Sequence, residues 1–239
     1  MKRALKWLGL VLLVIAVVLG AVWYSAFGNN SAIADAQVLA PGVETVKDGF
    51  VSAFVLDAGH GEVALIDAGN DKSGKAILAA LARRGLAASA VKAIFLTHGH
   101  GDHVAGCKVF PDARVYALQA DVALVGDHAK VTHPLEDGAI TDVGELRVET
   151  FSVPGHTPGS VVYLARGVLF FGDSAGASKD GTMMKAVRLF TKDSAENVRS
   201  LHALAERLTP RAQEIKTLAF AHTGPLSAFE PLATFARRP

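Results

Sequence analysis

The feature that most constrains how this chain can fold is an uncharged apolar stretch near its N-terminus. The stretch covers residues 7–31 and is densely apolar as far as Phe27. A helix of about 20 such residues is long enough to cross the hydrocarbon core of a bilayer. The sequence therefore predicts a transmembrane signal anchor at residues 1–28, a short polar linker at 29–36 and a folded domain at 37–239.

The charges on either side of the stretch predict its orientation. Lys2, Arg3 and Lys6 precede it, whereas the next basic residue is Lys47. Because positively charged flanks stay in the cytoplasm, we expect a cytoplasmic N-terminus and a domain outside the cytoplasm, in the periplasm or the extracellular space. Secretion after signal cleavage is the alternative, since Ala32-Ile33-Ala34 is a small-x-small site, although a cleaved signal has an apolar region of only about 7–15 residues.

Composition predicts one globular domain that does not bind nucleic acid. The 239 residues include 24 Lys and Arg against 23 Asp and Glu, a net charge of +1, and 50% of them are hydrophobic. Such a chain is too apolar for disorder and lacks the basic excess of a nucleic-acid surface. The single cysteine, Cys107, excludes an intramolecular disulfide framework and a cysteine-rich zinc site, and we expect it to be buried.

Short strand-like segments alternate with helical ones, which predicts a layered α/β fold. Residues 50–56 and 62–67 resemble two strands of a hairpin joined by a Gly59-His60-Gly61 turn. Apolar periodicity predicts helices at 75–84 and 194–208. Further strands are predicted at 91–96, 115–117, 146–151, 161–164, 168–171 and 217–221.

Chemically reactive side chains are concentrated where predicted strands end. Residues 97–103, Thr-His-Gly-His-Gly-Asp-His, place three imidazoles and a carboxylate directly after a buried strand. His98 and His100 can converge on one ion, while Asp102 and His103 can turn towards a second. Imidazole together with carboxylate favours zinc, manganese or iron over calcium or magnesium. A cluster without metal is disfavoured, because several imidazoles would be desolvated together.

Three later segments supply further candidate ligands, each a strand-like run that leads to a His or Asp beside glycine. These segments are residues 154–160 around His156, 170–174 around Asp173 and 219–225 around His222. Together with Asp67 in Leu65-Ile66-Asp67-Ala68-Gly69 and the histidine-rich segment, they form five motifs in a fixed order. This ordered set resembles the metallo-β-lactamase superfamily of hydrolases over nearly all of residues 37–239.

The resemblance implies a four-layer αββα sandwich, preceded here by the N-terminal transmembrane helix, with two divalent ions at one edge. Zinc is the expected metal, with iron or manganese as alternatives. The residues that resemble the ligands of the first ion are His98, His100 and His156. Those that resemble the ligands of the second ion are Asp102, His103 and His222.

Two carboxylates have separate roles in the same resemblance. Asp173 matches the carboxylate that bridges the two ions. Asp67 matches an aspartate that orients the histidine-rich loop without binding metal.

A site of this kind implies hydrolysis of a small molecule. Two ions roughly 3.5–4 Å apart can share a water, lower its pKa and hold a bridging hydroxide as the nucleophile. The expected target is an ester, thiolester or lactone carbonyl. Asp102 is the candidate catalytic residue, because it can orient the hydroxide or carry a proton. The sequence identifies neither the substrate-binding residues nor the oligomeric state.

The pattern also separates branches of the superfamily. The Asp102-His103 pair with Asp173 resembles the glyoxalase II-like thiolester hydrolases and the lactonases more than the β-lactamases, which usually lack the last aspartate. Only residues 227–239 follow Pro225-Leu226. We therefore expect the helical domain with which glyoxalase II holds glutathione to be missing, which disfavours a glutathione thiolester.

Residues 174–192 are expected either to overhang the site or to form a solvated loop.

Other functions remain open at this point. They are a two-metal phosphodiesterase, a β-lactamase, a mononuclear iron persulfide dioxygenase that would use the first site alone, and a membrane-tethered, non-catalytic metal-binding module. The near-neutral domain disfavours the phosphodiesterase. The remaining histidines fit no metal spacing and are expected in loops or at the surface: His60, His128, His133 and His202.

Overall fold

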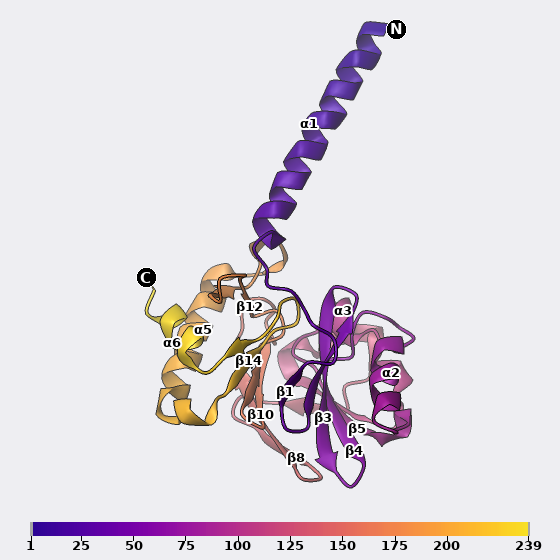
Figure 1. The fold of residues 1–239 in the computed structure, drawn as a ribbon, viewed down its shortest axis with the longest axis vertical. Helices are drawn as coiled ribbons and strands as arrows, with labels where there is room; N and C mark the ends of the chain where they lie inside the picture. Colours follow the sequence, from indigo (N-terminus) through magenta and orange to yellow (C-terminus); the bar gives the residue numbers. More distant parts are fainter. Residues whose placement is uncertain (1, 239) are drawn as a thin grey trace.

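The computed structural model describes residues 2–238 and shows a long N-terminal helix above a layered α/β body (Figure 1). Helix α1 (Lys2–Phe27) projects away from the body. The body contains mixed sheets flanked by helices, as the sequence predicts. The side chains of Lys2, Arg3 and Lys6, whose charges predict the orientation of α1, lie outside the described residues.

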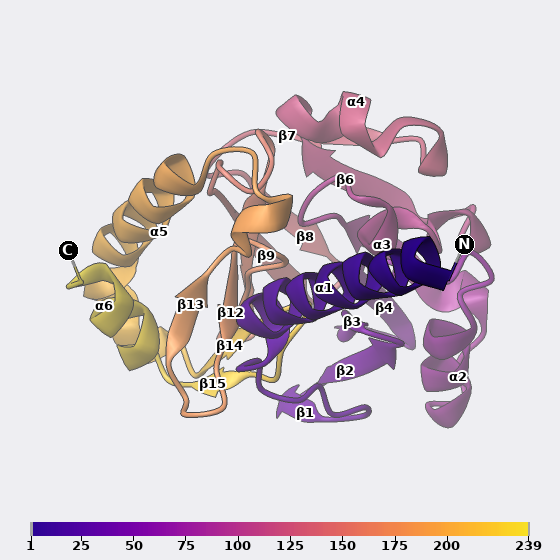
Figure 2. The same ribbon diagram turned by 90° about the horizontal axis from the view of Figure 1, so that it is seen from above.

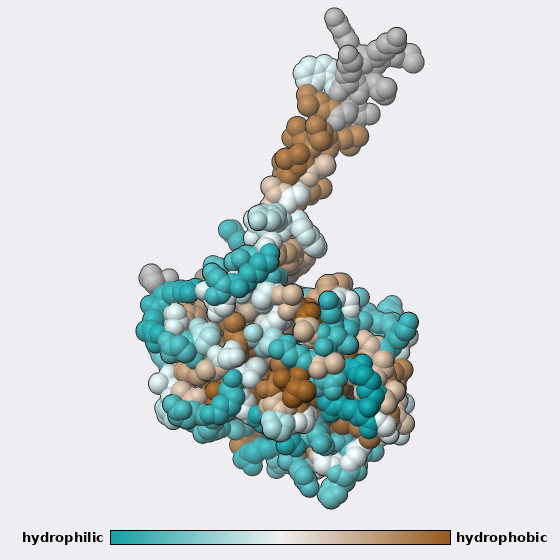
Figure 3. Space-filling view, viewed as in Figure 1, coloured by the Kyte–Doolittle hydropathy of each residue, from teal (hydrophilic) through white to brown (hydrophobic). Residues whose placement is uncertain are grey.

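Helix α1 is long and apolar enough to cross a membrane. Its segment Leu10–Phe27 has a mean hydropathy of 2.5, and none of its residues is fully buried. In Figure 3 this helix is a hydrophobic column above a body whose visible face is largely hydrophilic. The length and composition match the anchor that the sequence predicts, but a signal sequence has the same properties, so anchoring stays a prediction.

The first sheet has seven strands in the order β1-β2-β3-β4-β5-β6-β7. The hairpin predicted around Gly59-His60-Gly61 is present, since β3 and β4 pair antiparallel on either side of it. From β4 to β7 the strands run parallel. The bounds are β1 (Val38–Ala40), β2 (Val43–Asp48), β3 (Val51–Gly59), β4 (Glu62–Ile66), β5 (Val91–Phe95), β6 (Arg114–Leu118) and β7 (His133–Leu135).

The second sheet has six strands in the order β15-β14-β11-β10-β9-β8. Only the β11–β14 pair is parallel among the strand pairs described in this sheet. A separate hairpin consists of β12 (Ala175–Ala177) and β13 (Met183–Lys185). The bounds are β8 (Ile140–Val143), β9 (Leu146–Ser152), β10 (Val161–Ala165), β11 (Val168–Phe170), β14 (Thr217–Ala219) and β15 (Leu226–Ser227).

Helices cover the outer face of each sheet. Figure 2 shows α5 and α6 on one flank, α2 and α4 on the opposite flank, and the strands between them. The carboxylate of Asp193 caps α5 by accepting from the backbone N–H groups of Ala195 and Glu196. The bounds are α2 (Lys75–Arg83), α3 (Gly101–Val104), α4 (Val122–Val125), α5 (Ser194–Leu208) and α6 (Glu230–Ala236).

Three buried apolar clusters separate the layers. The central cluster joins the two sheets and includes Phe95, Tyr163 and Phe170. A second cluster fills the space between the first sheet and α2, and a third lies between the second sheet and helices α5 and α6. Two sheets face to face with helices outside both give the four-layer αββα sandwich that the resemblance implies.

Four strands end at the same edge of this sandwich. Strands β4 and β5 are parallel neighbours in the first sheet, and β11 and β14 are parallel neighbours in the second. The chain leaves these strands towards Asp67, His98, Asp173 and His222 respectively. The candidate residues from both sheets therefore meet at one edge, on the side of the body from which α1 departs (Figure 1).

Candidate metal centre

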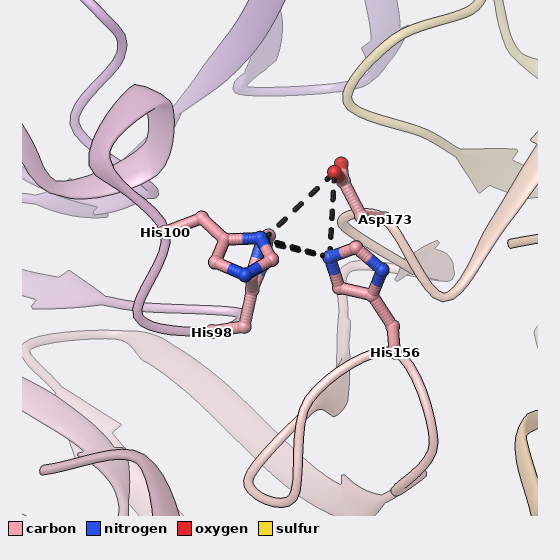
Figure 4. A group of neighbouring side chains, drawn as sticks. All are labelled: His98, His100, His156 and Asp173. Carbon is pink, nitrogen blue, oxygen red and sulfur yellow. Dashed lines mark hydrogen bonds and ion pairs between the residues drawn. The ribbon is translucent and has the colours of Figure 1, made fainter. Parts of the chain in front are cut away.

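The first group of candidate ligands is a triangle of imidazole nitrogens. His98 Nε2 lies 3.1 Å from His100 Nδ1 and 3.2 Å from His156 Nε2, and the last two atoms are 3.1 Å apart. A tetrahedral ion with metal–nitrogen bonds of about 2.0–2.1 Å places its ligand nitrogens about 3.3 Å apart. The triangle therefore has the size that a single zinc-like ion requires (Figure 4).

Neighbouring hydroxyls fix which nitrogen of two of these rings faces the centre. Thr97 Oγ1 lies 3.2 Å from His98 Nδ1, and Thr191 Oγ1 lies 3.4 Å from His156 Nδ1. Each threonine donates its own proton elsewhere, to Asp67 and to the Val187 carbonyl. Each hydroxyl is thus available to accept from its histidine, which leaves Nε2 free to bind an ion.

The second group lies beside the first and contains a carboxylate. Asp102 Oδ2 is 3.3 Å from His222 Nε2 and 3.8 Å from His103 Nε2. His222 is oriented by its Nδ1–H, which donates to the Phe50 carbonyl at 2.9 Å. The Phe50 ring also stacks on the His222 ring, with centroids 5.7 Å apart.

Asp173 lies between the two groups and faces each with a different oxygen. Its Oδ1 is 3.2 Å from both His103 Nε2 and His222 Nε2. Its Oδ2 is 3.6 Å from His156 Nε2 and 3.9 Å from His98 Nε2. Asp173 therefore faces both groups of candidate ligands.

Asp67 supports the centre from below without facing it. This residue is completely buried, and its Oδ2 accepts from His103 Nδ1 at 2.8 Å and from Thr97 Oγ1 at 2.7 Å. Gly172, with a φ of +52°, lies against that threonine, where a Cβ atom would collide with the hydroxyl. Asp67 thus contacts His103 and Thr97 directly, and its orienting role stays a prediction.

Burial keeps two imidazoles of the first group, His98 and His156, neutral. Burial, supported by the positive charge of neighbouring imidazoles, lowers the pKa of His98 well below its usual range. Burial likewise lowers the pKa of His156 to about 4. Both rings are therefore unprotonated at neutral pH, which is the form that binds metal.

Carboxylates have the opposite effect on the second group. Burial alone would lower the pKa of His103, but Asp173 and Asp67 outweigh it and raise that pKa well above its usual range. Asp173 and Asp102 similarly outweigh burial and raise the pKa of His222 to about 10. In return, the two imidazoles hold the pKa of Asp173 well below its usual range, although burial opposes this effect.

Two atoms of the centre are buried without a hydrogen-bond partner among the described residues. They are His103 Nε2 and Asp173 Oδ1, which face each other across the second group. Buried polar atoms left unpaired are costly, and a shared cation satisfies a neutral imidazole and a carboxylate together. The donor set and these unpaired atoms fit divalent metal.

Asp121 is a residue of the site that sequence reasoning missed. It is completely buried and accepts from the backbone N–H of Gly99 at 2.9 Å, from Thr157 Oγ1 at 2.7 Å and from the backbone N–H of Gly159 at 2.7 Å. It thereby ties the loop that carries His98 and His100 to the loop that carries His156. The only sequence signal is an isolated aspartate between the buried end of β6 and α4.

Residues 174–192 pack beside the first group instead of forming a free loop. They form the β12–β13 hairpin and a short 3₁₀ helix at Arg188–Phe190. The next residues contact the site, because Thr191 faces the His156 ring and the Lys192 N–H donates to the His156 carbonyl at 3.1 Å. These contacts place the segment at the margin of the centre.

The residues expected outside the site are outside it. His60, His128 and His133 are exposed, and His202 is half-buried on α5. Cys107 is buried, and burial raises the pKa of its thiol to about 12, so the thiolate nucleophile does not form at neutral pH.

Comparison with known proteins identifies the family. Residues 46–222 match the model of the metallo-beta-lactamase superfamily. A hydroxyacylglutathione hydrolase of Gloeobacter violaceus is 31% identical over 76% of this chain and 70% of its own length. One from Aeromonas hydrophila is 37% identical over 47% of this chain and 42% of its own length. One from Xanthomonas euvesicatoria is 29% identical over 73% of this chain and 66% of its own length.

Solved structures show the same fold. The MIM-2 metallo-β-lactamase superimposes with a TM-score of 0.65 and 20% identity, over 90% of this chain and 91% of that one. A metallo-β-lactamase family protein from Thermus thermophilus gives a TM-score of 0.61 with 23% identity, over 83% and 79%. Taken with the family match and the His/Asp cluster, these findings show that the chain belongs to the metallo-β-lactamase superfamily and is a metal-dependent hydrolase of that superfamily.

Proposed function

We propose that this protein is a dinuclear hydrolase that cleaves the ester, thiolester or lactone carbonyl of a small molecule. The observation that carries the proposal is the position of Asp173, whose two oxygens face two separate groups of ligands. A mononuclear enzyme needs only the first of these groups. The names of the curated relatives support the thiolester class.

The residues would divide between two ions bridged by Asp173. The first ion would be held by His98, His100 and His156, and the second by Asp102, His103 and His222. Zinc is the proposed metal, with iron or manganese as alternatives. Bound divalent ions would activate water as the nucleophile and polarise the carbonyl of the substrate.

The protein's own groups would prepare and orient the reactants. Asp102 is the candidate catalytic residue: burial opposes its ionisation, but a hydrogen bond from His222 and the charge of His103 lower its pKa. The carboxylate is therefore ionised at neutral pH and can accept a hydrogen bond from the attacking water or take up its proton. Asp67 would keep Nε2 of His103 turned towards the centre.

We further propose that residues 1–28 anchor the enzyme in a membrane, with residues 29–36 as the connection and 37–239 as the hydrolase domain. The apolar helix Leu10–Phe27 supports the anchor, and the basic residues before it favour a cytoplasmic N-terminus and an extracytoplasmic domain. Secretion after cleavage is the alternative outcome. Protease protection of the domain in sealed membrane vesicles would distinguish the possible topologies.

Substrate turnover by the full chain in detergent tests the proposal. The panel contains an S-acyl glutathione, a simple thiolester, a lactone, a β-lactam and an aryl phosphodiester, each measured before and after removal of metal. We expect metal-dependent turnover of a thiolester or lactone. Asp173→Asn should abolish it, whereas His128→Ala, which changes an exposed histidine, should not. Turnover of the phosphodiester alone, or a metal-loaded protein without turnover, would contradict the proposal.

A further inference from the structure

Exposed large apolar side chains on the body gather around the metal centre. Outside α1, the described residues of this kind are Val38, Phe50, Leu124, Ile140, Leu189 and Phe190. Four of them, Phe50, Leu124, Leu189 and Phe190, adjoin the centre, and we call these four the apolar rim. Their exposed fractions range from 43% for Leu124 to 64% for Leu189. Such a gathering of exposed apolar surface marks an interaction site.

Each member of the apolar rim lies beside a loop with candidate ligands. Phe50 stacks on His222. Leu124 lies against the backbone of Gly99, where a Cβ atom would be 2.8 Å from the Leu124 Cβ. Leu189 and Phe190 directly precede Thr191, whose hydroxyl faces the His156 ring. The rim therefore lies beside three of the loops that carry candidate ligands.

The end of helix α1 contacts this rim. The Phe27 ring, in the last turn of the helix, lies 6.2 Å from the Phe190 ring between centroids. Immediately after the helix, the Gly28 carbonyl accepts from Lys179 Nζ at 2.7 Å. The apolar helix thus begins its path away from the body directly beside the rim.

The residues after α1 are fixed to the segments that follow two candidate ligands. The Ser31 N–H donates to the Ala177 carbonyl at 2.9 Å, and the Lys179 N–H donates to the Asn29 carbonyl at 2.9 Å. The Ser31 carbonyl accepts from the Gly224 N–H, two residues after His222. Residues 29 and 31, which directly follow α1, are hydrogen-bonded to the body. A bilayer crossed by α1 would therefore begin at the edge that carries the centre.

Charge at the same edge fits a lipid surface. The segment around the 3₁₀ helix exposes four basic residues and two acidic ones: Lys179, Lys185, Arg188, Lys192, Asp180 and Asp193. Exposed Lys and Arg beside a membrane attract anionic headgroups, while Phe and Leu insert below them. The rim thus has both components of an interfacial membrane contact.

We propose that the apolar rim seats in the bilayer surface and that the centre takes its substrate from there, as an amphiphile with a long acyl chain whose carbonyl reaches the metal site. The substrate half of this proposal rests on the proposed hydrolase function. The docking half rests on α1 as an anchor and on the rim itself.

Depth-dependent quenching tests the docking half without any need for turnover. Leu189→Cys in the full chain is labelled with an environment-sensitive fluorophore and placed in phosphatidylcholine–phosphatidylglycerol vesicles that contain nitroxide-labelled lipids. Native Cys107 gives little background, because it is buried with a pKa of about 12. Ile140→Cys, an exposed apolar position on β8, is the matched control. We expect strong quenching and a blue shift at position 189 only. Equal signals at both positions would overturn the docking.

Acyl-chain dependence tests the substrate half. For wild type we expect kcat/KM to rise with chain length in a thiolester or lactone series, by up to roughly fourfold per buried methylene. Leu189→Glu with Phe190→Glu should reduce the ratio of long-chain to short-chain kcat/KM at least about tenfold, equivalent to the loss of two methylene contacts. Ile140→Glu should leave the ratio unchanged. Short and long chains cleaved equally by wild type would overturn the proposal, whereas failure to cleave any carbonyl substrate would contradict the hydrolase function instead.

Discussion

The two halves of the metal centre differ in how the protein prepares their histidines. In the half formed by His98, His100 and His156, burial lowers the pKa of His98 and of His156. In the half formed by Asp102, His103 and His222, carboxylates raise the pKa of both rings. In the proposed dinuclear site, His98 and His156 would therefore be ready to bind an ion, while His103 and His222 would have to release protons before binding one. The comparison therefore predicts that the two proposed sites do not fill together, although their ligands are similar.

Loss of a ligand from either half should have the largest effect on activity. His98→Ala or His222→Ala should reduce kcat/KM by more than about a thousandfold, because charge stabilisation by a bound ion contributes several kcal/mol. Native mass spectrometry should show that each variant loses one ion and keeps the other. If His98→Ala lost both ions and His222→Ala lost neither, the division into two independent halves would be wrong.

Removal of the orienting carboxylate should weaken the second half selectively. Asp67→Ala should reduce metal affinity about 10–100-fold, the usual result of losing a partner behind a ligand. Asp67 holds His103 directly, whereas its connection to His98 passes through Thr97. Chelator competition should therefore show the weaker ion lost first. Full occupancy of both sites against the chelator would contradict this role of Asp67.

Acidification should empty the second half before the first. With a pKa of about 10, His222 remains protonated over the neutral range without metal, so an ion must displace that proton, and affinity should fall about tenfold per pH unit for each proton displaced. Because the pKa of His156 is about 4, protons compete with metal for this ring only in stronger acid. Metal titrations between pH 5 and 8 should show that the affinity for the second ion depends more steeply on pH than the affinity for the first. An equal dependence on pH for both ions would contradict this prediction. Activity should fall progressively on acidification, in parallel with the loss of the second ion.

The same shifts predict opposite effects on the stability of the metal-free protein. The raised pKa of His222 contributes stability below its unfolded value of about 6.5, and this contribution disappears as the pH rises towards 10. The lowered pKa of His156 has the reverse effect, since stability is lost as the pH falls from about 6.5 towards 4. Melting temperatures of His222→Gln and His156→Gln, measured across this pH range and compared with wild type, would separate the two contributions to stability. If both variants changed the pH dependence of stability in the same way, the opposite pKa shifts of His222 and His156 would be contradicted.

The smallest effect is expected from the partner of His156. Thr191→Val removes the hydroxyl that accepts from the ring at 3.4 Å but keeps the shape of the side chain. A hydrogen bond of this kind contributes about 0.5–1.5 kcal/mol, so a loss of roughly 2–10-fold in affinity for the first ion is expected. Thr182→Val, on the β12–β13 hairpin, is a control in the same segment. Equal losses in both variants would show that the hairpin as a whole, and not Thr191, is responsible.

The sequence predicted those parts of the centre that are encoded locally. His98, His100, Asp102 and His103 follow one strand within six positions, so a short pattern reveals them. The flanking strands and the hairpin at Gly59-His60-Gly61 were predicted for the same reason. Strands β1, β2, β7, β8, β12, β13 and β15 were not predicted, since they are short or carry polar residues on one face, and pairing with neighbours rather than their own composition makes them strands.

Tertiary contacts account for the rest. Asp121 contributes to the site through hydrogen bonds with Thr157 and Gly159, which are distant from it in the sequence. No local sequence pattern around Asp121 indicates these partners. The connection after α1 was expected to be a simple polar linker, yet Asp35 accepts from the Lys47 N–H and Asn30 pairs with Ser178. The boundaries 1–28, 29–36 and 37–239 themselves stay a prediction.

Asp121 also bears on how such an enzyme could acquire new substrates. Its carboxylate is hydrogen-bonded both to the loop of His98 and to the loop of His156, so it couples ligand loops that come from the two sheets. Residues 179–190, which lie in the described part of the chain and make no hydrogen bond with Asp121, are then expected to tolerate changes of sequence without displacing the ligands. A library that randomises residues 179–190 while keeping Asp121 and its partners should therefore yield altered selectivity on an intact catalytic framework.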